Sequence, residues 1–515
     1  MSSVSRRDFL KGSLAVAGAT FAIGTSARPV LGANEALNIG VAGINGRGQS
    51  HMSAYLGMKD VRITYLIDPD SRIFEARAKR CEMHGGKKEE YEEQVKDKKT
   101  GEMKTVKKTR VTGPGPNGKP QCVQDIRKAL EDKNLDAVSI ASTNSTHSLL
   151  AIWSMQAGKD VYVEKPATHN VHEGRMLVET AKKHQRMLQH GTQSRGSSGW
   201  AKAAALARSG QLGKLAVSYG WASKPRSGIG FKKPEPVPNG LDFNLWLGPA
   251  PEQPFHRNLV HYNWHWFWDF GNADTGNQGV HQMDIARWGL PDDHWTKPFK
   301  VMSLGGRFAF NDQGQTPNAH LTLFDFGNYQ LIFESCNLVT RGDKKKDIPN
   351  TVSVSNAYHT EKGVLDSGGF TPKGGKREKL PDIKVDMGAG GDIFNNFIQC
   401  VRTRDEKGLL TGPMACHLSS ALCHLGAIAC RIGSVVPFAE SRKIFGDHAA
   451  AVASLDKMEW RMKSRGVKID DSLKYQVGPV LTFDPTVEKF VGNDKANALL
   501  TRNYRKPFVV PDKVV

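Results

Sequence analysis

A buried-strand pattern that runs into a glycine-rich turn constrains this fold more than any other feature. Residues 36–42 are mostly apolar and lead into the turn GINGRG at residues 43–48, and a helix is expected over residues 51–58. In such a unit the glycines let the backbone approach a pyrophosphate, and the helix N-terminus supplies amide donors to it. The turn departs from G-x-G-x-x-G, because Asn stands at the second glycine, but Asn tolerates a left-handed backbone. The expected nucleotide contacts are Gly43, Asn45, Gly46, Arg47 and Gly48.

An acidic residue follows the next expected strand. This strand spans residues 61–67 and ends at Asp68, twenty residues beyond Gly48. A carboxylate there can accept hydrogen bonds from both ribose hydroxyls and repels a 2′-phosphate, which favours NAD over NADP. Arg72 lies close by in the sequence and keeps NADP open. Asp68 is also a suitable N-cap for the following helix, and this alternative stands beside the cofactor role.

Strands and helices then alternate as in a doubly wound parallel sheet. After a lysine-rich insertion at about 85–119, helices are expected over 123–131, 149–157 and 171–184, and strands over 137–141, 161–163 and 187–190. This alternation predicts an α/β fold in which residues 34–167 form a Rossmann nucleotide-binding domain.

Polar residues follow two of these strands at the edge where ligands bind. In an open parallel sheet, ligands lie beyond the carboxyl ends of the strands. Strand 137–141 is followed by hydroxyl and amide side chains that suit the nicotinamide ribose but could instead cap the next helix, and strand 161–163 ends in an acid, a base and Pro166. The expected cofactor contacts here are Thr143, Asn144, His147, Glu164 and Lys165.

The insertion carries part of the formal net charge of +19. Its Lys and Glu residues alternate without apolar periodicity, and neither an aromatic nor an Arg-rich binding pattern accompanies them. We therefore expect a solvated excursion and no nucleic-acid partner, with an acidic polysaccharide as the less favoured alternative.

The second half of the chain has a different pattern. Strands are expected over residues 301–308, 320–326, 329–335 and 351–358, after long Pro- and Gly-rich loops. We predict a C-terminal α+β domain with an open, mostly antiparallel sheet over residues 168–400. C-terminal helices and an extended tail are expected over residues 401–515.

Two segments of this half suit substrate chemistry. Residues 262–268 are dense in aromatics, and Trp can stack on the C–H face of a sugar while its N–H reaches a hydroxyl. Residues 271–288 form a polar loop and a helix on which His281, Asp284 and Trp288 share one face. His281 titrates in the range needed to accept a hydroxyl proton. The expected substrate contacts are Trp264, His265 and Arg195.

Glu164-Lys165-Pro166, followed by the Gly-x-His-x-x-Asp segment at residues 279–284, resembles the Gfo/Idh/MocA oxidoreductase family. The glycine turn, Asp68 and the segment Trp246-Leu247-Gly248-Pro249 extend the resemblance over nearly the whole chain. It implies a Rossmann domain followed by a larger α/β domain that binds substrate and whose open sheet often forms a dimer face, so we expect a homo-oligomer.

The resemblance also implies catalytic roles. Lys165 would orient the substrate and ease loss of its hydroxyl proton, and His281 would be the general base. Many relatives carry an aspartate four residues before this histidine, where the present chain has Asn277. Asp284 or Asp274 could compensate for the missing charge. The expected catalytic residues are Lys165, His281, Asn277 and Asp284.

The N-terminus matches a Tat export signal, which we assign to residues 1–33. Twin arginines at positions 6 and 7 precede Phe-Leu-Lys and a short apolar run at residues 14–23, which is too short to span a bilayer. We expect a periplasmic or otherwise exported protein that folds with its cofactor before export, and no further membrane span. The seven cysteines show no metal spacing and are expected as core thiols, without a disulfide framework or a metal site.

The leading functional hypothesis is an exported NAD(P)-dependent oxidoreductase that acts on a sugar, sugar acid or polyol. A second is an NAD-dependent glycosidase that works by transient oxidation, elimination and hydration, as the resemblance to exported relatives implies. A third is a non-catalytic sugar-binding protein, favoured only by the departures at Asn45 and Asn277.

Overall fold

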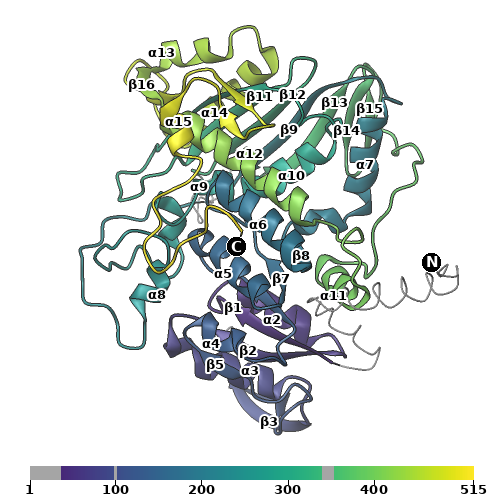
Figure 1. Ribbon diagram of the computed structural model, residues 1–515, viewed down its shortest axis with the longest axis vertical. Helices are drawn as coiled ribbons and strands as arrows, with labels where there is room; N and C mark the ends of the chain where they lie inside the picture. Colours follow the sequence, from purple (N-terminus) through teal and green to yellow (C-terminus); the bar gives the residue numbers. More distant parts are fainter. Residues whose placement is uncertain (1–35, 98–100, 225, 339–352, 515) are drawn as a thin grey trace, which may run out of the picture. The chain divides into compact units, whose positions relative to one another are not determined.

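The computed structural model describes residues 36–97, 101–224, 226–338 and 353–514 (Figure 1). The predicted signal, residues 1–33, lies outside these residues. The first part of the described chain forms a six-stranded parallel sheet in the order β5-β2-β1-β6-β7-β8. Its strands are β1 (Leu37–Ala42), β2 (Val61–Ile67), β5 (Gln121–Val123), β6 (Ala137–Ile140), β7 (Asp160–Val163) and β8 (Leu188–His190).

The order reverses at β1, which lies between β2 and β6, so a crevice is expected at the carboxyl ends of these strands. Because β8 pairs with β7, the sheet continues past the boundary predicted near residue 167. The helices of this part are α2 (Gly48–Leu56), α3 (Phe74–Met83), α4 (Ile126–Leu130), α5 (Asn144–Gln156) and α6 (Val171–His184).

The lysine-rich insertion is a β-hairpin. β3 (Lys88–Lys96) and β4 (Met103–Val111) pair with each other in antiparallel register, and every residue of β4 is exposed. Cross-strand ion pairs such as Glu93–Lys108, at 2.9 Å, link its two strands. The insertion is therefore solvated as predicted, but it has regular structure.

The rest of the chain builds an eleven-stranded sheet, with the main order β15-β14-β13-β9-β12-β11-β10-β17-β16. β9 and β12 are parallel and the other pairs are antiparallel, which confirms the predicted mostly antiparallel sheet. The strands are β9 (Leu215–Ser223), β10 (Phe299–Gly306), β11 (Ala319–Asp325), β12 (Gln330–Cys336), β13 (Ser353–Thr360), β14 (Gly363–Asp366), β15 (Gly369–Pro372), β16 (Ser434–Pro437), β17 (Lys474–Val477), β18 (Leu481–Asp484) and β19 (Lys489–Phe490).

Helices cover both faces of this sheet. Met283 of α10 (Gly279–Trp288) and Leu422 of α12 (Pro413–Arg431) share a core with Phe333 of β12. On the other face, Leu455 of α14 (Ala449–Lys463) packs with Leu321 of β11. Strands β16 to β19 join this sheet, and α11 (Ile393–Thr403) crosses the predicted boundary at residue 401, so residues 401–515 are not a separate unit.

Among the described residues, α12 is long and apolar enough to cross a membrane by length and composition, but 89% of that window is buried inside the fold. Helix α12 packs against helix α6, from the first part of the chain, and against the large sheet.

The chain after α15 (Asp494–Ala498) returns to the first sheet. Arg505 donates from Nε to the carbonyls of Gly248 and Ala250, at 3.1 and 3.0 Å. Phe508 lies 6.2 Å from Trp153 of α5 between ring centroids. The tail therefore packs against residues from both halves of the chain.

Candidate active site

A cavity of about 250 Å³ opens at the carboxyl ends of β1, β2, β6 and β7, at the expected crevice. Of the predicted cofactor residues, only Gly48 does not line it. The predicted residues on its wall are Gly43, Asn45, Gly46, Arg47, Asp68, Thr143, Asn144, His147, Glu164 and Lys165.

The glycine turn has the geometry of a ligand-binding loop. Gly43 has φ +83°, and a Cβ there would lie 2.5 Å from the carbonyl of Ala141. A Cβ on Gly48 would lie 2.0 Å from the main-chain oxygen of Gly43, whereas Gly46 faces open space. Arg47 is the N-cap residue of α2. Its side chain makes no capping bond and instead donates from Nε to Glu164 at 2.8 Å. The turn therefore places main-chain groups and the N-terminus of α2, which has no side-chain cap, at the cavity. This arrangement suits a pyrophosphate.

Asp68 is buried beside this turn, with 6% of its surface exposed. Its Oδ2 accepts from the main-chain N–H of Ile44 at 2.9 Å, and its Oδ1 accepts from that of Asp70 at 3.0 Å. The carboxylate that caps the following short helix, residues 71–73, belongs to Asp70, so the capping alternative for Asp68 is wrong. Arg72 also binds Asp70, at 2.6 Å, and does not line the cavity.

Asn144 begins α5, and Thr143 occupies the N-cap position without a side-chain capping bond. The side chain of Asn144 is 2% exposed, and its Nδ2 has no hydrogen-bond partner among the described residues. A buried donor without an acceptor is costly, so a cofactor oxygen in this cavity would satisfy it. This unpartnered donor and the open space at Gly46 show that the cavity walls fit a dinucleotide.

His147 holds the loop beyond Lys165 instead of offering a free ring nitrogen. Its Nδ1 lies 2.7 Å from the main-chain oxygen of Pro166, and its Nε2 lies 3.1 Å from that of Ser142. Burial lowers the pKa of His147 to about 4, so the ring is neutral at neutral pH.

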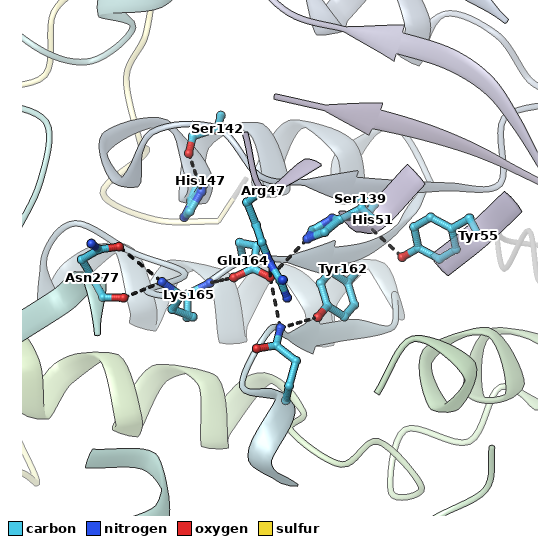
Figure 2. Close-up of polar contacts among 11 residues, drawn as sticks. Arg47, His51, Tyr55, Ser139, Ser142, His147, Tyr162, Glu164, Lys165 and Asn277 are labelled. Atoms are coloured by element: carbon cyan, nitrogen blue, oxygen red, sulfur yellow. Dashed lines mark hydrogen bonds and ion pairs between the residues drawn. The ribbon is translucent and has the colours of Figure 1, made fainter. Parts of the chain in front are cut away.

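Glu164 is the centre of a polar network beside the cavity (Figure 2). Its Oε1 accepts from Arg47, lies 3.1 Å from Nε2 of His51 and accepts from Gln193 at 3.1 Å. Burial opposes ionisation of Glu164, but the hydrogen bond from His51 and the charges of Arg47 and Lys165 outweigh it and hold the pKa well below its usual value. Glu164 is therefore a fixed negative charge next to Lys165.

Lys165 reaches across to the second half of the chain (Figure 2). Its Nζ donates to the main-chain oxygen of Asn277 at 2.5 Å, and Oδ1 of Asn277 lies 3.4 Å away. Asn277 is the last residue of α9 (Ala273–Asn277), and its Nδ2 donates to Asp274 at 3.2 Å. Burial lowers the pKa of Lys165, although the charge of Glu164 opposes the shift. Lys165 and Asn277 both line the cavity.

His281 lines a neighbouring cavity of about 460 Å³, together with Gln193, Trp200 and Asn356. It does not line the cavity of Lys165. Burial and then the positive charge of Lys165 lower the pKa of His281 to about 3, so the two side chains act on each other through space. The described structure therefore brings Lys165 and Asn277 together in one cavity. His281 lies near them but lines a separate cavity.

Arg195, predicted to contact substrate, and Asp284, predicted to support His281, bind each other. The charge of Asp284 acts to raise the pKa of His281, but burial and the charge of Lys165 outweigh it. The guanidinium of Arg195 donates to both carboxylate oxygens, at 2.7 and 2.9 Å, and lies 4.3 Å from the ring centroid of Trp288. Ser419 donates to the same carboxylate at 2.6 Å. Both side chains are buried, and the bonds between them already give their polar groups partners.

The aromatic segment divides between core and cavity. Trp264 lines the cavity and donates from Nε1 to the main-chain oxygen of His261 at 3.0 Å. His265 is 1% exposed, lies 2.7 Å through Nδ1 from the carbonyl of Tyr262 and does not line the cavity, so its predicted substrate contact is not seen. Asp274, the other expected compensating acid, pairs with Arg226 at 3.0 Å.

Sequence reasoning missed several wall residues from distant segments. They are Trp153 of α5, Tyr262 and Phe508 of the tail, and all three line the cavity. The aromatic residue in the expected extended tail was the only available signal for Phe508.

The fold and the cavity define a dinucleotide-binding protein with a Rossmann sheet and a second, mixed-sheet domain. The NAD-binding Rossmann fold of the Gfo/Idh/MocA oxidoreductase family matches residues 37–192, and the C-terminal alpha/beta domain of this family matches residues 215–465. The chain belongs to this NAD-binding oxidoreductase family. A twin-arginine translocation signal sequence matches residues 3–22.

Two curated relatives match part of the chain. Myo-inositol 2-dehydrogenase of Thermotoga maritima is 32% identical over 97 residues, which are 19% of this chain and 29% of that protein. The NAD(+)-dependent scyllo-inositol 2-dehydrogenase of Bacillus subtilis is 33% identical over 91 residues, 18% of this chain and 27% of that protein. The matches thus span less than a third of either relative.

The WlbA dehydrogenase of Bordetella pertussis, solved with NADH and UDP-GlcNAcA, shares the fold. Its TM-score is 0.51 at 13% identity, over 75% of this chain and 94% of that chain.

Within the described residues, no group of three or more His, Cys, Asp or Glu side chains is placed to hold a metal ion. The seven cysteines are free, and six of them are buried.

Proposed function

We propose that this protein is an exported, NAD-dependent oxidoreductase that acts on a hydroxyl group of a polyol, sugar or sugar acid. One observation carries the proposal: the ammonium of Lys165 and the end of α9 at Asn277 lie in the same cavity as the glycine turn and Asp68. The two inositol dehydrogenases that match part of the chain favour a cyclic polyol among these substrates.

The chain's own groups support proton transfer at Lys165. Burial lowers the pKa of its ammonium, which increases the neutral fraction that can accept a proton. The carbonyl of Asn277 accepts a hydrogen bond from Nζ, and Glu164 places a negative charge nearby, so a substrate hydroxyl can bind beside Nζ. Bound NAD would supply the hydride acceptor. The predicted role of His281 as general base stays a proposal, and its neutral ring is compatible with accepting a proton.

Discrimination against NADP would come from Asp68. Its carboxylate lines the cavity, whereas Arg72, which could have paired with a 2′-phosphate, is bound to Asp70. The 2′-phosphate of NADP would therefore meet the negative charge of Asp68.

The match to a Tat signal sequence supports the proposed export. Because this route carries folded proteins, we propose that the enzyme crosses the membrane with its nucleotide already bound, and that the homo-oligomer implied by the family resemblance uses the large sheet.

The test is turnover with the purified exported form. The protein is first examined by mass spectrometry for co-purified nucleotide and then incubated with NAD and myo-inositol, scyllo-inositol, glucose or gluconate, while the absorbance of the reduced cofactor is followed. Formation of reduced cofactor with one of these supports the proposal. Release of the aglycone from chromogenic glycosides without net cofactor change would replace it with the glycosidase alternative. Absence of nucleotide binding and of turnover would reject both.

A further inference from the structure

A second cavity, of about 290 Å³, lies on the other side of the loop that carries Lys165. It is bordered by that loop at His169, by the start of α9 at Asn272, by α12 at His424 and Arg431, and by the tail at Arg502. Its volume is close to the lower limit of small-molecule sites, about 300 Å³. The active-site cavity shares none of these residues.

The inner wall of this cavity carries polar atoms without partners in the described structure. Asn272 is 6% exposed, and its Oδ1 accepts no hydrogen bond while its Nδ2 donates to the carbonyl of His169 at 3.1 Å. His424 is 2% exposed; its Nε2 lies 2.8 Å from Thr168, and its Nδ1 is unpartnered. Buried groups of this kind are normally paired, so they point to a bound partner that brings its own polar atoms.

His169 adds a buried donor. Arg502 can only donate, and its Nη1 lies 3.2 Å from Nδ1 of His169, so Nδ1 must be the acceptor. Burial and the charge of Arg502 keep the pKa of His169 well below its usual value, so the neutral ring carries its proton on Nε2. That atom faces the main chain of Gly271 but makes no hydrogen bond of full geometry within the described residues. The wall thus presents a donor at His169 and an acceptor at Asn272.

The mouth of the cavity is positively charged. Arg502 lies 3.8 Å from the carboxylate of Asp269, which offsets its charge. Arg431 is placed over Trp268, at 5.0 Å from the ring centroid, and has no ion pair within the described residues. One positive charge is therefore left at the mouth. Guanidinium groups bind carboxylates and phosphates through paired N–H donors.

We propose that this cavity is a second ligand site that binds a small hydroxy acid. The carboxylate would pair with Arg431 at the mouth, and hydroxyl groups of the same molecule would donate to Oδ1 of Asn272 and accept from Nε2 of His169. A hydroxy acid carries one negative charge for Arg431 and hydroxyl groups that can both donate and accept hydrogen bonds. Inorganic phosphate has no carbon chain that bears hydroxyl groups. An uncharged polyol has no anionic group.

The test is calorimetric titration of the full exported protein with sodium D-gluconate, at constant ionic strength. Because gluconate is also a candidate substrate, the titration is repeated on Asn277→Ala, which alters the active-site cavity and leaves the second one intact. We expect one gluconate to bind this variant, with the affinity that the second site has in the unaltered protein. We expect acetate, myo-inositol and phosphate to bind at least tenfold more weakly.

Arg431→Gln should weaken gluconate binding to the Asn277→Ala protein at least tenfold, and Arg431→Lys should retain part of it. Arg62→Gln, which changes an exposed arginine on β2, is the matched control and should leave the affinity unchanged. An equal melting temperature of these variants establishes that the fold is kept. Unchanged affinity in Arg431→Gln, loss of all binding in Asn277→Ala, or phosphate binding as tightly as gluconate would each overturn the proposal. None of these outcomes depends on turnover, so the oxidoreductase proposal is tested separately.

Discussion

Nζ of Lys165 donates a hydrogen bond to the main-chain oxygen of Asn277, at 2.5 Å. The lysine ends a strand of the parallel sheet, and the asparagine ends a short helix from the second half of the chain. The contact is made to the backbone, so it does not require the aspartate that many relatives carry at this position. The neutral side chain of Asn277 leaves Lys165 without the negative charge that an aspartate would add.

Replacement of Lys165 by Met should lower kcat by about 10²- to 10⁴-fold, the range for loss of a general acid–base group. The affinity for NAD should change little, because the nucleotide would be held mainly by the glycine turn and Asp68. Steady-state kinetics and calorimetric titration with NAD check the two parts. Lys128→Met is the matched control, since that side chain is 68% exposed and pairs only with Glu131 on the surface. Equal turnover in the two variants would reject the role of Lys165.

Asn277→Asp should raise the pKa of Lys165, because a carboxylate would replace the amide oxygen that lies 3.4 Å from Nζ. If neutral Lys165 accepts the substrate proton, activity rises with pH through this pKa. The rising limb of the kcat/KM profile should then move to higher pH in the variant, and Asn277→Ser should not show this displacement. A limb that stays in place or moves to lower pH would contradict the assignment.

Asp68→Asn should relax the choice between NAD and NADP. The variant removes the negative charge but keeps an oxygen that can accept from Ile44 or Asp70. We expect the Kd for NAD to rise at least tenfold and that for NADP to fall or stay constant. Titrations with both nucleotides measure this ratio, and circular dichroism shows whether the fold is kept. An unchanged ratio would mean that discrimination lies elsewhere.

Phe508→Ala should raise the Kd for NAD by about two- to tenfold, since an aromatic contact contributes on the order of 0.5–1.5 kcal/mol beyond its buried area. Phe508 lines the cavity, and its ring lies 6.2 Å from that of Trp153, another lining residue. Phe231→Ala is the control, because that ring is 65% exposed. Titration with NAD compares the two variants, and equal affinities would exclude Phe508 from the nucleotide site.

Arg195→Met should destabilise the fold by about 3–5 kcal/mol, because it leaves the buried carboxylate of Asp284 without its partner. Burial opposes ionisation of Asp284, but the charge and hydrogen bonds of Arg195 lower its pKa. The stabilisation is therefore present above the unfolded-state pKa of about 3.9 and is lost as the pH falls toward the lower folded-state value.

Urea denaturation at neutral and acidic pH measures this loss. Arg208→Met removes an exposed pair with Asp292 and should cost less than about 1 kcal/mol. A similar cost for the two variants would show that the buried pair adds little.

The sequence predicted those parts of the site that depend on local pattern. The glycine turn, Asp68 and Lys165 each follow a strand directly, so strand order alone brings them to one edge of the sheet. The start of α5 was placed five residues late, because its first turn consists of buried polar residues that give no amphipathic signal.

Long-range partners could not be predicted in this way. Arg195 and Asp284 look like candidate site residues in the sequence, and only the packing of α10 against the short 3-10 helix η2 (Gln193–Gly196) shows that they bind each other. The contact between Lys165 and Asn277 was not predicted, because the two residues are 112 positions apart and the family resemblance related Asn277 only to His281. The second cavity needs residues from four segments, none of which carries a recognisable motif.

The tail has a consequence for the order in which the protein is made. Translation delivers the glycine turn early and Phe508 only after both sheets, yet the two lie on the wall of one cavity. A nascent chain still lacking Arg505 and Phe508 would have an open nucleotide site, and full affinity would arise only after the second sheet has been synthesised. Tight nucleotide retention would then report that both halves have folded, which gives the cell a chemical criterion for releasing the finished protein to export.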